Sequence, residues 1–329
     1  MNYIVFGGSG FIGYHLLKLI REDCIGSNDE IYAPDISMPE SATDRIEGVK
    51  YVYCDVRNPI SLKGFVPTPQ DIIFNFAAIH RTPGHTDHEY FETNILGADN
   101  VTAFAQSCGI ESILFTSSIA PYGAGEDLKL EDSLPTPNTP YGISKLVAEK
   151  IHAAWQTADK SRRLTILRPG VVFGKGERGN FTRMYQGIKG RYFFYAGRRD
   201  TVKACVYVKD LTGFMKYLMI DNDFPGVGLF NCTYQPAPTV DEICEAIKRV
   251  TGLERRTLTI PALALKAAAV CAAPFGGEKL GLHPDRVGKL MASTNVSGKR
   301  LEECEYRMRY TLEDALSDWL MDCGGRCLE

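Results

Sequence analysis

The sequence predicts an α/β protein built on a doubly wound, parallel sheet. Short apolar runs rich in β-prone residues alternate with helical patterns through the first half of the chain, which is the order that parallel sheets require. The run at residues 72–78 is almost wholly apolar, as expected for a strand with both faces buried. A glycine-rich turn joins the first run to the first helix. These features favour one large α/β unit with a smaller appendage.

Composition and charge argue against several classes of protein. The chain has 329 residues, of which 44% are hydrophobic and 23% are charged, as in soluble globular proteins. The formal net charge of −3 provides no broad basic field, so we expect no nucleic-acid partner. Ten cysteines lie scattered without zinc-ligand spacing, which predicts no metal site and favours a reducing cytoplasm.

The sequence contains no predicted membrane-spanning segment. It begins directly with a strand pattern, so we expect no signal peptide, and no run reaches the roughly 18 apolar residues that a spanning helix needs. Residues 261–274 carry an alanine and leucine run that is compatible with contact to a membrane or a polyprenyl chain. A helix packed over the C-terminal part of the fold is the favoured alternative. We expect a cytoplasmic protein, with peripheral contact at the inner face of the cell membrane left open.

The first strand, helix and turn form the pattern of a dinucleotide site. Residues 2–6 are β-prone, residues 15–20 have helical spacing, and Gly7, Gly10 and Gly13 lie in the turn between them. Glycines at these positions allow a tight turn, close approach to a pyrophosphate and packing of helix on strand. The helix N-terminus adds free N–H groups that favour phosphate. The strand–turn–helix context favours this function over an ordinary tight turn.

The second strand supplies a candidate ribose-binding acid. The run at residues 31–33 leads to Asp35, about 20 residues after Gly13, where an acid binds the adenosine ribose hydroxyls. This carboxylate would repel a 2′-phosphate, and no arginine follows within several residues. The sequence therefore predicts NAD in preference to NADP. A plain loop carboxylate is the alternative for Asp35.

Further strands are predicted at residues 49–56, 113–118 and 164–168, with helices at 94–108 and from Pro140. The fifth strand ends in the hydroxyls of Ser117 and Ser118, at the sheet edge where open α/β proteins bind ligands.

Beyond Pro169 the pattern loosens, with strands at 204–208 and 228–232 and helices opened by Thr239 and Thr311. We predict a Rossmann-type NAD-binding domain at 1–169, with returning segments near 204–233. Residues 170–329 would form mainly a smaller, interleaved substrate-binding domain.

Tyr141 and Lys145 are the candidate proton-transfer pair. Residues four apart on a helix share one face, and an ammonium beside a phenol favours the phenolate, which can exchange a proton near neutral pH. Thr139 and Pro140 read as the N-cap and first turn of that helix. Such a pair is common on ordinary surface helices, so the surrounding motifs decide its meaning.

Taken in order, these motifs resemble the extended short-chain dehydrogenase/reductase superfamily and its NAD-dependent epimerase/dehydratase branch. The matching pieces, found throughout most of the chain, are Gly7-x-x-Gly10-x-x-Gly13, Asp35, residues 54–56, 75–78 and 117–123, Tyr141-x-x-x-Lys145, and residues 167–169 and 207–211. The resemblance implies a tightly held NAD and a catalytic set of Ser118, Tyr141 and Lys145. Ser118 enters because it lies four residues before Tyr122 in the Ser-Ser-x-x-x-Tyr-Gly motif.

The resemblance also implies the other site residues. The implied cofactor contacts are Gly7, Gly10, Phe11, Ile12, Gly13, Asp35, Asp55, Val56, Ala77, Ala78, Tyr141, Lys145, Pro169 and Val171. The implied substrate contacts are His80, Ser118, Asn180, Lys203 and Arg286. Lys203 stands where an arginine is commoner, so it would contact the diphosphate as a point charge and not through the two parallel hydrogen bonds that a guanidinium makes.

Within the superfamily the chain is similar to sugar 4-epimerases, including those that act on N-acetylglucosamine carried on undecaprenyl diphosphate. The similar stretches are residues 77–81, 163–169, 173–180 and 285–289. This implies transient oxidation at C4 of a (N-acetyl)hexose on a nucleotide or lipid diphosphate. A 4-keto-sugar reductase with exchangeable NAD(P)H and a non-catalytic dinucleotide sensor remain as alternatives. The resemblance further implies a homodimer, formed by helices near 94–108 and 140–155.

Overall fold

A parallel sheet of seven strands forms the centre of the fold in the computed structural model, which describes residues 1–23, 26, 29–39, 41, 44–80, 84–222, 227–265, 267 and 291–329. The strand order is β11-β7-β5-β4-β1-β2-β3, with every neighbouring pair parallel. The strands are β1 (Asn2–Phe6), β2 (Glu30–Asp35), β3 (Val49–Tyr53), β4 (Ile72–Asn75), β5 (Ser112–Thr116), β7 (Arg163–Pro169) and β11 (Val227–Cys232). The predicted doubly wound parallel sheet is confirmed.

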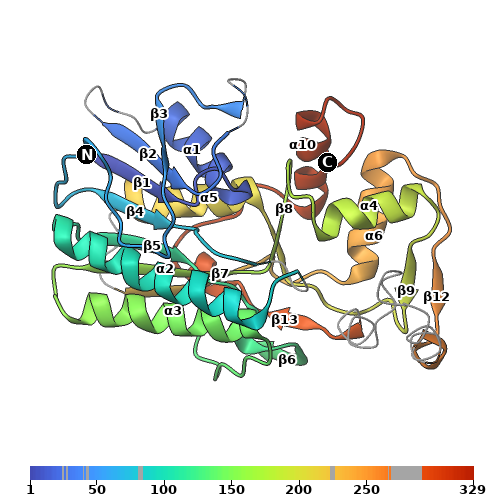
Figure 1. The fold of residues 1–329 in the computed structure, drawn as a ribbon. Coiled ribbons are helices and arrows are strands. Elements are labelled where there is room, and N and C mark those ends of the chain that lie inside the picture. The colour runs from blue at the N-terminus through green and yellow to red at the C-terminus, as the bar shows by residue number, and fades with distance from the viewer. Residues whose placement is uncertain are drawn as a thin grey trace.

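Helices cover both faces of the sheet (Figure 1). One face carries α1 (Phe11–Asp23) and α5 (Val208–Lys216), and the other carries α2 (Asp87–Cys108) and α3 (Pro140–Thr157). The alternating side chains of β1 fill both cores. Tyr3 and Val5 pack with α1 and α5, whereas Ile4 and Phe6 pack with α2 and α3, in a cluster that also holds Trp155. A strand with two apolar faces is therefore fully buried.

Helix α2 begins seven residues earlier than predicted, at Asp87 instead of Asn94. Thr86 and Glu89 form a reciprocal capping box at its N-terminus, and Gly109 ends it in the left-handed conformation with φ of 66°. The first three residues of this helix, 87–89, are polar, and the first buried one is Tyr90. The predicted stop at Gly109 is confirmed.

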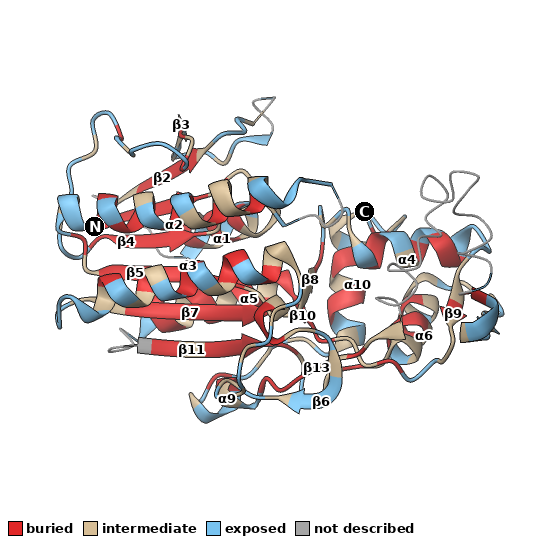
Figure 2. Ribbon diagram, turned by 60° about the horizontal axis from the view of Figure 1, so that its bottom comes forward, coloured by how far each residue is buried: buried red, intermediate tan, exposed pale blue. Residues whose placement is uncertain are grey.

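Among the described residues, the C-terminal lobe combines helices with short strand pairs. Its elements are α4 (Asn180–Lys189), α6 (Val240–Thr251) and α10 (Leu312–Asp322), with β8 (Val171–Phe173) beside β10 (Cys205–Tyr207) and β9 (Phe194–Ala196) beside β12 (Leu258–Ile260). Phe173, Phe181 and Trp319 lie in its apolar core, and Figure 2 shows the buried inner faces of these helices. Thr239 forms the predicted capping box. Thr311, the predicted start of the last helix, forms one as well, with Asp314.

Smaller elements connect the two lobes and had no counterpart in the predictions. They are β6 (Gly125–Lys129) paired with β13 (Thr294–Val296), α9 (Lys299–Glu303) and the short helices η2 (Ala120–Tyr122) and η3 (Tyr217–Asp221).

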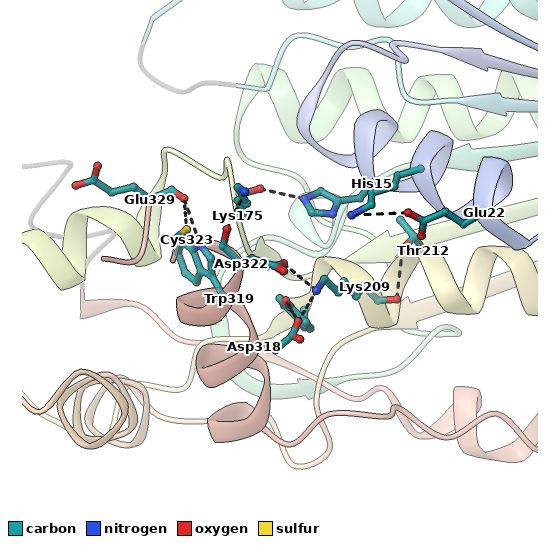
Figure 3. Close-up of polar contacts among 12 residues, drawn as sticks. His15, Glu22, Lys175, Lys209, Thr212, Asp318, Trp319, Asp322, Cys323 and Glu329 are labelled. Carbon is teal, nitrogen blue, oxygen red and sulfur yellow. Dashed lines mark hydrogen bonds and ion pairs between the residues drawn. The ribbon is translucent and has the colours of Figure 1, made fainter. Parts of the chain in front are cut away.

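Polar contacts between α5 and α10 join the lobes (Figure 3). Lys209 Nζ lies 2.6 Å from Asp318 Oδ2 and 2.8 Å from Asp322 Oδ2. His15 Nε2 lies 2.9 Å from the carbonyl oxygen of Lys175, so α1 also contacts the segment that leads to α4. The sheet and the C-terminal lobe are thus held together by charges carried on helices.

Some of the sequence-based predictions concern residues that the structure does not describe, and one concerns membrane-spanning helices. Arg286 and most of residues 261–274 lie outside the described ranges. Within those ranges, no helix is both long and apolar enough to cross a membrane.

Asp210 makes folding stability depend on pH. Its Oδ1 accepts a hydrogen bond of 2.7 Å from the backbone N–H of Arg309, while its buried Oδ2 has no partner among the described residues. Burial raises the pKa of Asp210 from 3.8 to about 6. The folded protein therefore binds this proton more tightly, so the contribution of Asp210 to stability is full below about pH 4 and is lost as pH rises through 6, by about 3 kcal/mol.

We predict that Asp210→Asn removes this loss, because an amide oxygen still accepts from Arg309 and carries no charge. Denaturant unfolding at pH 4 and pH 7 measures it as a change in the free-energy difference between variant and wild type. Parallel pH profiles for the two proteins would contradict the assignment.

Candidate active site

Of the three motif glycines Gly7, Gly10 and Gly13, only Gly10 is exposed. Gly7 has φ of 76°, and a Cβ there would lie 2.9 Å from the backbone N of Ala77. A Cβ on Gly13 would lie 2.4 Å from the carbonyl oxygen of Gly7. Around Gly10, the one contact is that same carbonyl oxygen at 3.1 Å. Gly7 and Gly13 therefore close the turn onto β4 and α1, and Gly10 leaves room for a ligand at the helix N-terminus.

Polar groups of this loop fit a dinucleotide. Asp35 at the end of β2 accepts hydrogen bonds from the backbone N–H groups of Ser9, at 3.0 Å, and Ser37, at 2.9 Å. The Ser9 hydroxyl oxygen is buried without a hydrogen-bond partner among the described residues, and such a group is costly unless a ligand satisfies it. An orphaned hydroxyl beside an open glycine suits the phosphates and ribose of NAD.

Most other predicted cofactor residues lie along the same edge of the sheet. Phe11 and Ile12 open α1, Ala77 and Ala78 follow β4, Pro169 ends β7 and Val171 begins β8.

Asp55 is engaged within the protein. Arg57 contacts both of its carboxylate oxygens and lowers its pKa. Val56 next to it is buried, and its carbonyl oxygen accepts a hydrogen bond from Asn100.

Ser118, Tyr141 and Lys145 meet where β5 ends and α3 begins. Thr139 caps α3 with its side chain, as predicted. Ser118 follows β5, and its Oγ accepts a hydrogen bond from the backbone N–H of Ala120 at 3.1 Å. Burial raises the pKa of Tyr141 to about 12, and a hydrogen bond with Ser118 opposes this rise. The serine and tyrosine hydroxyls are therefore neighbours in the site.

The expectation that Lys145 lowers the tyrosine pKa is wrong for the protein alone. Lys145 Nζ donates to the carbonyl oxygen of Thr116 at 2.8 Å and lies 4.9 Å from the ring centre of Phe115. Burial lowers the pKa of Lys145 to about 7. The amine thus points to the end of β5, and burial disfavours charge on both the phenol and the amine.

A buried ion pair one turn along α3 was missed by the sequence analysis. Arg168 on β7 contacts both carboxylate oxygens of Glu149, at 2.8 and 2.6 Å, and Ser117 donates to the same carboxylate at 2.5 Å. Arg168 also lies 4.6 Å from the ring centre of Tyr122. Glu149 is four residues after Lys145, so helical spacing places it on the face of α3 that packs against the sheet. Its partners Arg168 and Ser117 lie far away in the sequence, so no local pattern predicts the ion pair.

His152 continues this inner face. It stacks on Phe115 with ring centres 4.2 Å apart, its Nδ1 contacts the carbonyl oxygen of Ala148 at 2.8 Å, and its Nε2 lies 3.2 Å from Asn75 Nδ2. Burial lowers its pKa to about 4, so this histidine is neutral and structural.

The predicted substrate residues come from both the sheet domain and the C-terminal lobe. His80 is exposed after β4, and Asn180 is the first residue of α4, where Arg183 donates to its Oδ1 at 2.8 Å. Lys203 Nζ donates to the carbonyl oxygen of Ala292 at 2.6 Å, and burial lowers its pKa to about 8. The structure gives no position for Arg286, the fifth predicted contact.

A second cation that the sequence analysis missed lies near Lys203. Arg198 forms an ion pair with Glu126 of β6, and both side chains contact the buried hydroxyl of Ser293, each at 2.9 Å. The charges of Arg198 and Glu126 both act on the pKa of Lys203. Within the described ranges, no group of three or more His, Cys, Asp or Glu side chains is placed to hold a metal ion.

The parallel sheet, the glycine loop with its acid and the Ser–Tyr–Lys set define a dinucleotide-dependent protein of the short-chain dehydrogenase/reductase type. Residues 3–231 match the model of the NAD dependent epimerase/dehydratase family. The chain therefore belongs to that family, as its motifs predict.

Named relatives match nearly the whole chain. An N-acetyl-α-D-glucosaminyl-diphospho-ditrans,octacis-undecaprenol 4-epimerase of Escherichia coli O157:H7 is 26% identical over 96% of this chain and 93% of its own length. A UDP-glucose 4-epimerase of Yersinia pestis is 24% identical over 97% and 96%. The solved UDP-glucose 4-epimerase of Thermus thermophilus, a complex with NAD, has a TM-score of 0.74 at 20% identity and covers 99% of each chain.

We predict that Gly10→Ala and Gly13→Ala separate cofactor binding from folding. The methyl at Gly10 meets one backbone atom, the carbonyl oxygen of Gly7 at 3.1 Å, so the variant should lose less stability than Gly13→Ala and lose NAD affinity by about tenfold or more. The methyl at Gly13 meets backbone at 2.4 Å, and this overpacking should cost about 1–3 kcal/mol of stability. NAD titration and thermal unfolding of both variants measure the contrast. Unchanged NAD affinity in Gly10→Ala would show that the ligand lies elsewhere.

Proposed function

We propose that this protein is an NAD-dependent epimerase acting on C4 of a hexose or N-acetylhexose carried on a diphosphate. The carrier is undecaprenol or a nucleotide, as in the names of the relatives that match nearly the whole chain. The observation that supports it most is the meeting of Ser118, Tyr141 and Lys145 at the sheet edge that bears the glycine loop. Proton transfer groups beside a dinucleotide cradle suit reversible alcohol oxidation.

Tyr141 takes the proton of the sugar C4 hydroxyl during oxidation and returns it during reduction. Bound NAD would supply the hydride chemistry, both for oxidation at C4 and for reduction from the other face of the sugar. Ser118 donates a hydrogen bond to the C4 oxygen and steadies the developing carbonyl. Lys145 holds the tyrosine helix turn against the end of β5 through Thr116. The proposal includes no net redox change, so the cofactor stays in place.

The diphosphate would bind beside the C-terminal lobe. Lys203 supplies a cation and Asn180 a side-chain amide at the start of α4, where backbone N–H groups favour anions. Arg286 and His80 complete the proposed contacts, with His80 on the sugar side after β4. We assign residues 1–169 with the returning segments near 204–233 to the cofactor, and residues 170–329 mainly to the substrate.

We predict that the purified protein epimerises at least one of UDP-N-acetylglucosamine, UDP-glucose and polyprenyl-diphosphate-N-acetylglucosamine without added cofactor. Tyr141→Phe should lower kcat by about 100-fold or more, because it removes the proton acceptor. The measurement is C4 configuration by NMR, with Tyr185→Phe, a buried tyrosine in the other lobe, as the matched control. Stoichiometric NADH consumption would instead identify a keto-sugar reductase, and full activity of Tyr141→Phe would remove the catalytic assignment.

We further propose a cytoplasmic homodimer with peripheral contact to the membrane. Leu96 on α2 and Ile143 and Val147 on α3 are exposed apolar residues on neighbouring helices. Pairing these two helices with their copies would bury them in a four-helix contact.

We predict that Leu96→Glu with Val147→Glu gives a monomer at micromolar concentration, because four buried carboxylates would face one another across the contact. Analytical ultracentrifugation measures the mass. Val66→Glu with Leu128→Glu, two exposed apolar residues outside these helices, adds the same charge and should leave a dimer. A wild-type protein that sediments as a monomer would refute this interface.

A further inference from the structure

A pocket of about 350 Å³ lies at the far end of the C-terminal lobe, away from the sheet. It is formed by the last turn of α4, the segment entering β9 and the residues just before β12, and includes Ile188, Phe193 and Thr257. Figure 1 places these elements at the end of the molecule opposite β2 and β3. None of these residues belongs to the proposed cofactor or sugar contacts.

Three arginines line this pocket. Arg191, Arg255 and Arg256 line it together with one carboxylate residue, Glu254, and none of the three has an ion-pair partner in the described part of the chain. Arg255 Nε is buried with no hydrogen-bond partner among those residues. A buried guanidinium nitrogen without an acceptor is costly, and guanidinium groups match phosphate oxygens in geometry and charge.

The ends of nearby helices do not account for this cluster. Helix α4 ends at Lys189 and α6 at Thr251, and a helix C-terminus attracts cations with about half a charge. No arginine side chain of the pocket is hydrogen-bonded to a terminal carbonyl within the described residues. A monoanionic or dianionic phosphate group brings a full negative charge or more into contact with the arginines, and therefore neutralises them better than two helix C-termini do.

Several apolar side chains beside the pocket are exposed to solvent. Tyr192 is 66% exposed and Leu258 is 62% exposed, and each is the chain neighbour of a pocket residue. Leu263, just after β12, is 81% exposed. Cations flanked by exposed aromatic and aliphatic side chains are typical of surfaces that lie on anionic membranes, whereas a site for a free phosphate needs no such rim.

We propose that this pocket binds the phosphate of an anionic phospholipid headgroup while Tyr192, Leu258 and Leu263 enter the membrane interface. The proposal rests on the proposed function with undecaprenol as the carrier, so that the sugar is joined to a lipid diphosphate. Helix α4 runs from Asn180, a proposed diphosphate contact, to Lys189 beside the pocket, a span of about 15 Å. A protein bound to the membrane in this way would have its proposed diphosphate contact, Asn180, about 15 Å from the lipid phosphates.

Vesicle co-sedimentation of the full-length protein tests this, without any sugar substrate. We expect binding to vesicles of phosphatidylcholine with about 30% phosphatidylglycerol, little binding to phosphatidylcholine alone, and weakening by salt. Arg191→Glu with Arg256→Glu should lower the partition coefficient by about tenfold or more. Lys63→Glu with Lys160→Glu, two exposed lysines of the sheet domain, makes the same change in net charge and should bind normally.

Two further variants separate the charge from the apolar contribution. Arg255→Gln should weaken binding while circular dichroism stays unchanged, and Leu258→Ser should weaken binding that persists in high salt. An equal loss of vesicle binding in the Lys63→Glu, Lys160→Glu control would show that only net charge matters, and would refute the assignment of a lipid phosphate to this pocket.

Tight binding of inorganic phosphate by calorimetry, with no preference for phosphatidylglycerol, would show a site for a soluble phosphate and overturn the membrane assignment. Epimerisation of UDP-sugars is read without vesicles, so failure of the proposed function is distinguishable from failure of this surface.

Discussion

The ion pair between Arg168 and Glu149 is the contact on which the geometry of the candidate site depends. It joins α3 to β7 at the ligand-binding edge of the sheet, and both side chains are buried. Breaking such a pair costs about 3–5 kcal/mol, because one charge remains buried without its partner. Lys145 lies one turn and Tyr141 two turns nearer the start of the same helix. Their positions against β5 therefore follow from an interaction that touches no ligand.

Burial shifts the pKa values of Tyr141 and Lys145 in opposite directions, but both shifts favour the neutral form of the side chain. The pKa of Tyr141 rises to about 12 and that of Lys145 falls to about 7, so both side chains are kept closer to their neutral forms. Glu149 opposes this effect on Lys145. The protein alone thus supplies shape and hydrogen bonds, and charge in the site depends strongly on what is bound there.

Local sequence predicted the parts of this fold that have local causes. Apolar strands, the glycine turn and the caps at Thr139, Thr239 and Thr311 lie where the pattern places them. The polar start of α2 was missed because amphipathic spacing begins later, and the three-residue strand β13 is too short to carry a pattern. The direction of the Lys145 amine could not be read, because its acceptor on β5 is set by tertiary packing.

One of the two tryptophans of this chain lies in an apolar core of the sheet domain and the other in the apolar core of the C-terminal lobe. Trp155 is buried on α3 against the sheet, and Trp319 is buried on α10 in the C-terminal lobe. The molecule therefore carries an intrinsic fluorophore for each half, and replacing either one by phenylalanine leaves a spectroscopic probe of the other. Tryptophan fluorescence of these variants can show, without an attached dye, whether the two halves unfold together or in sequence. It can also show which half changes when a ligand binds.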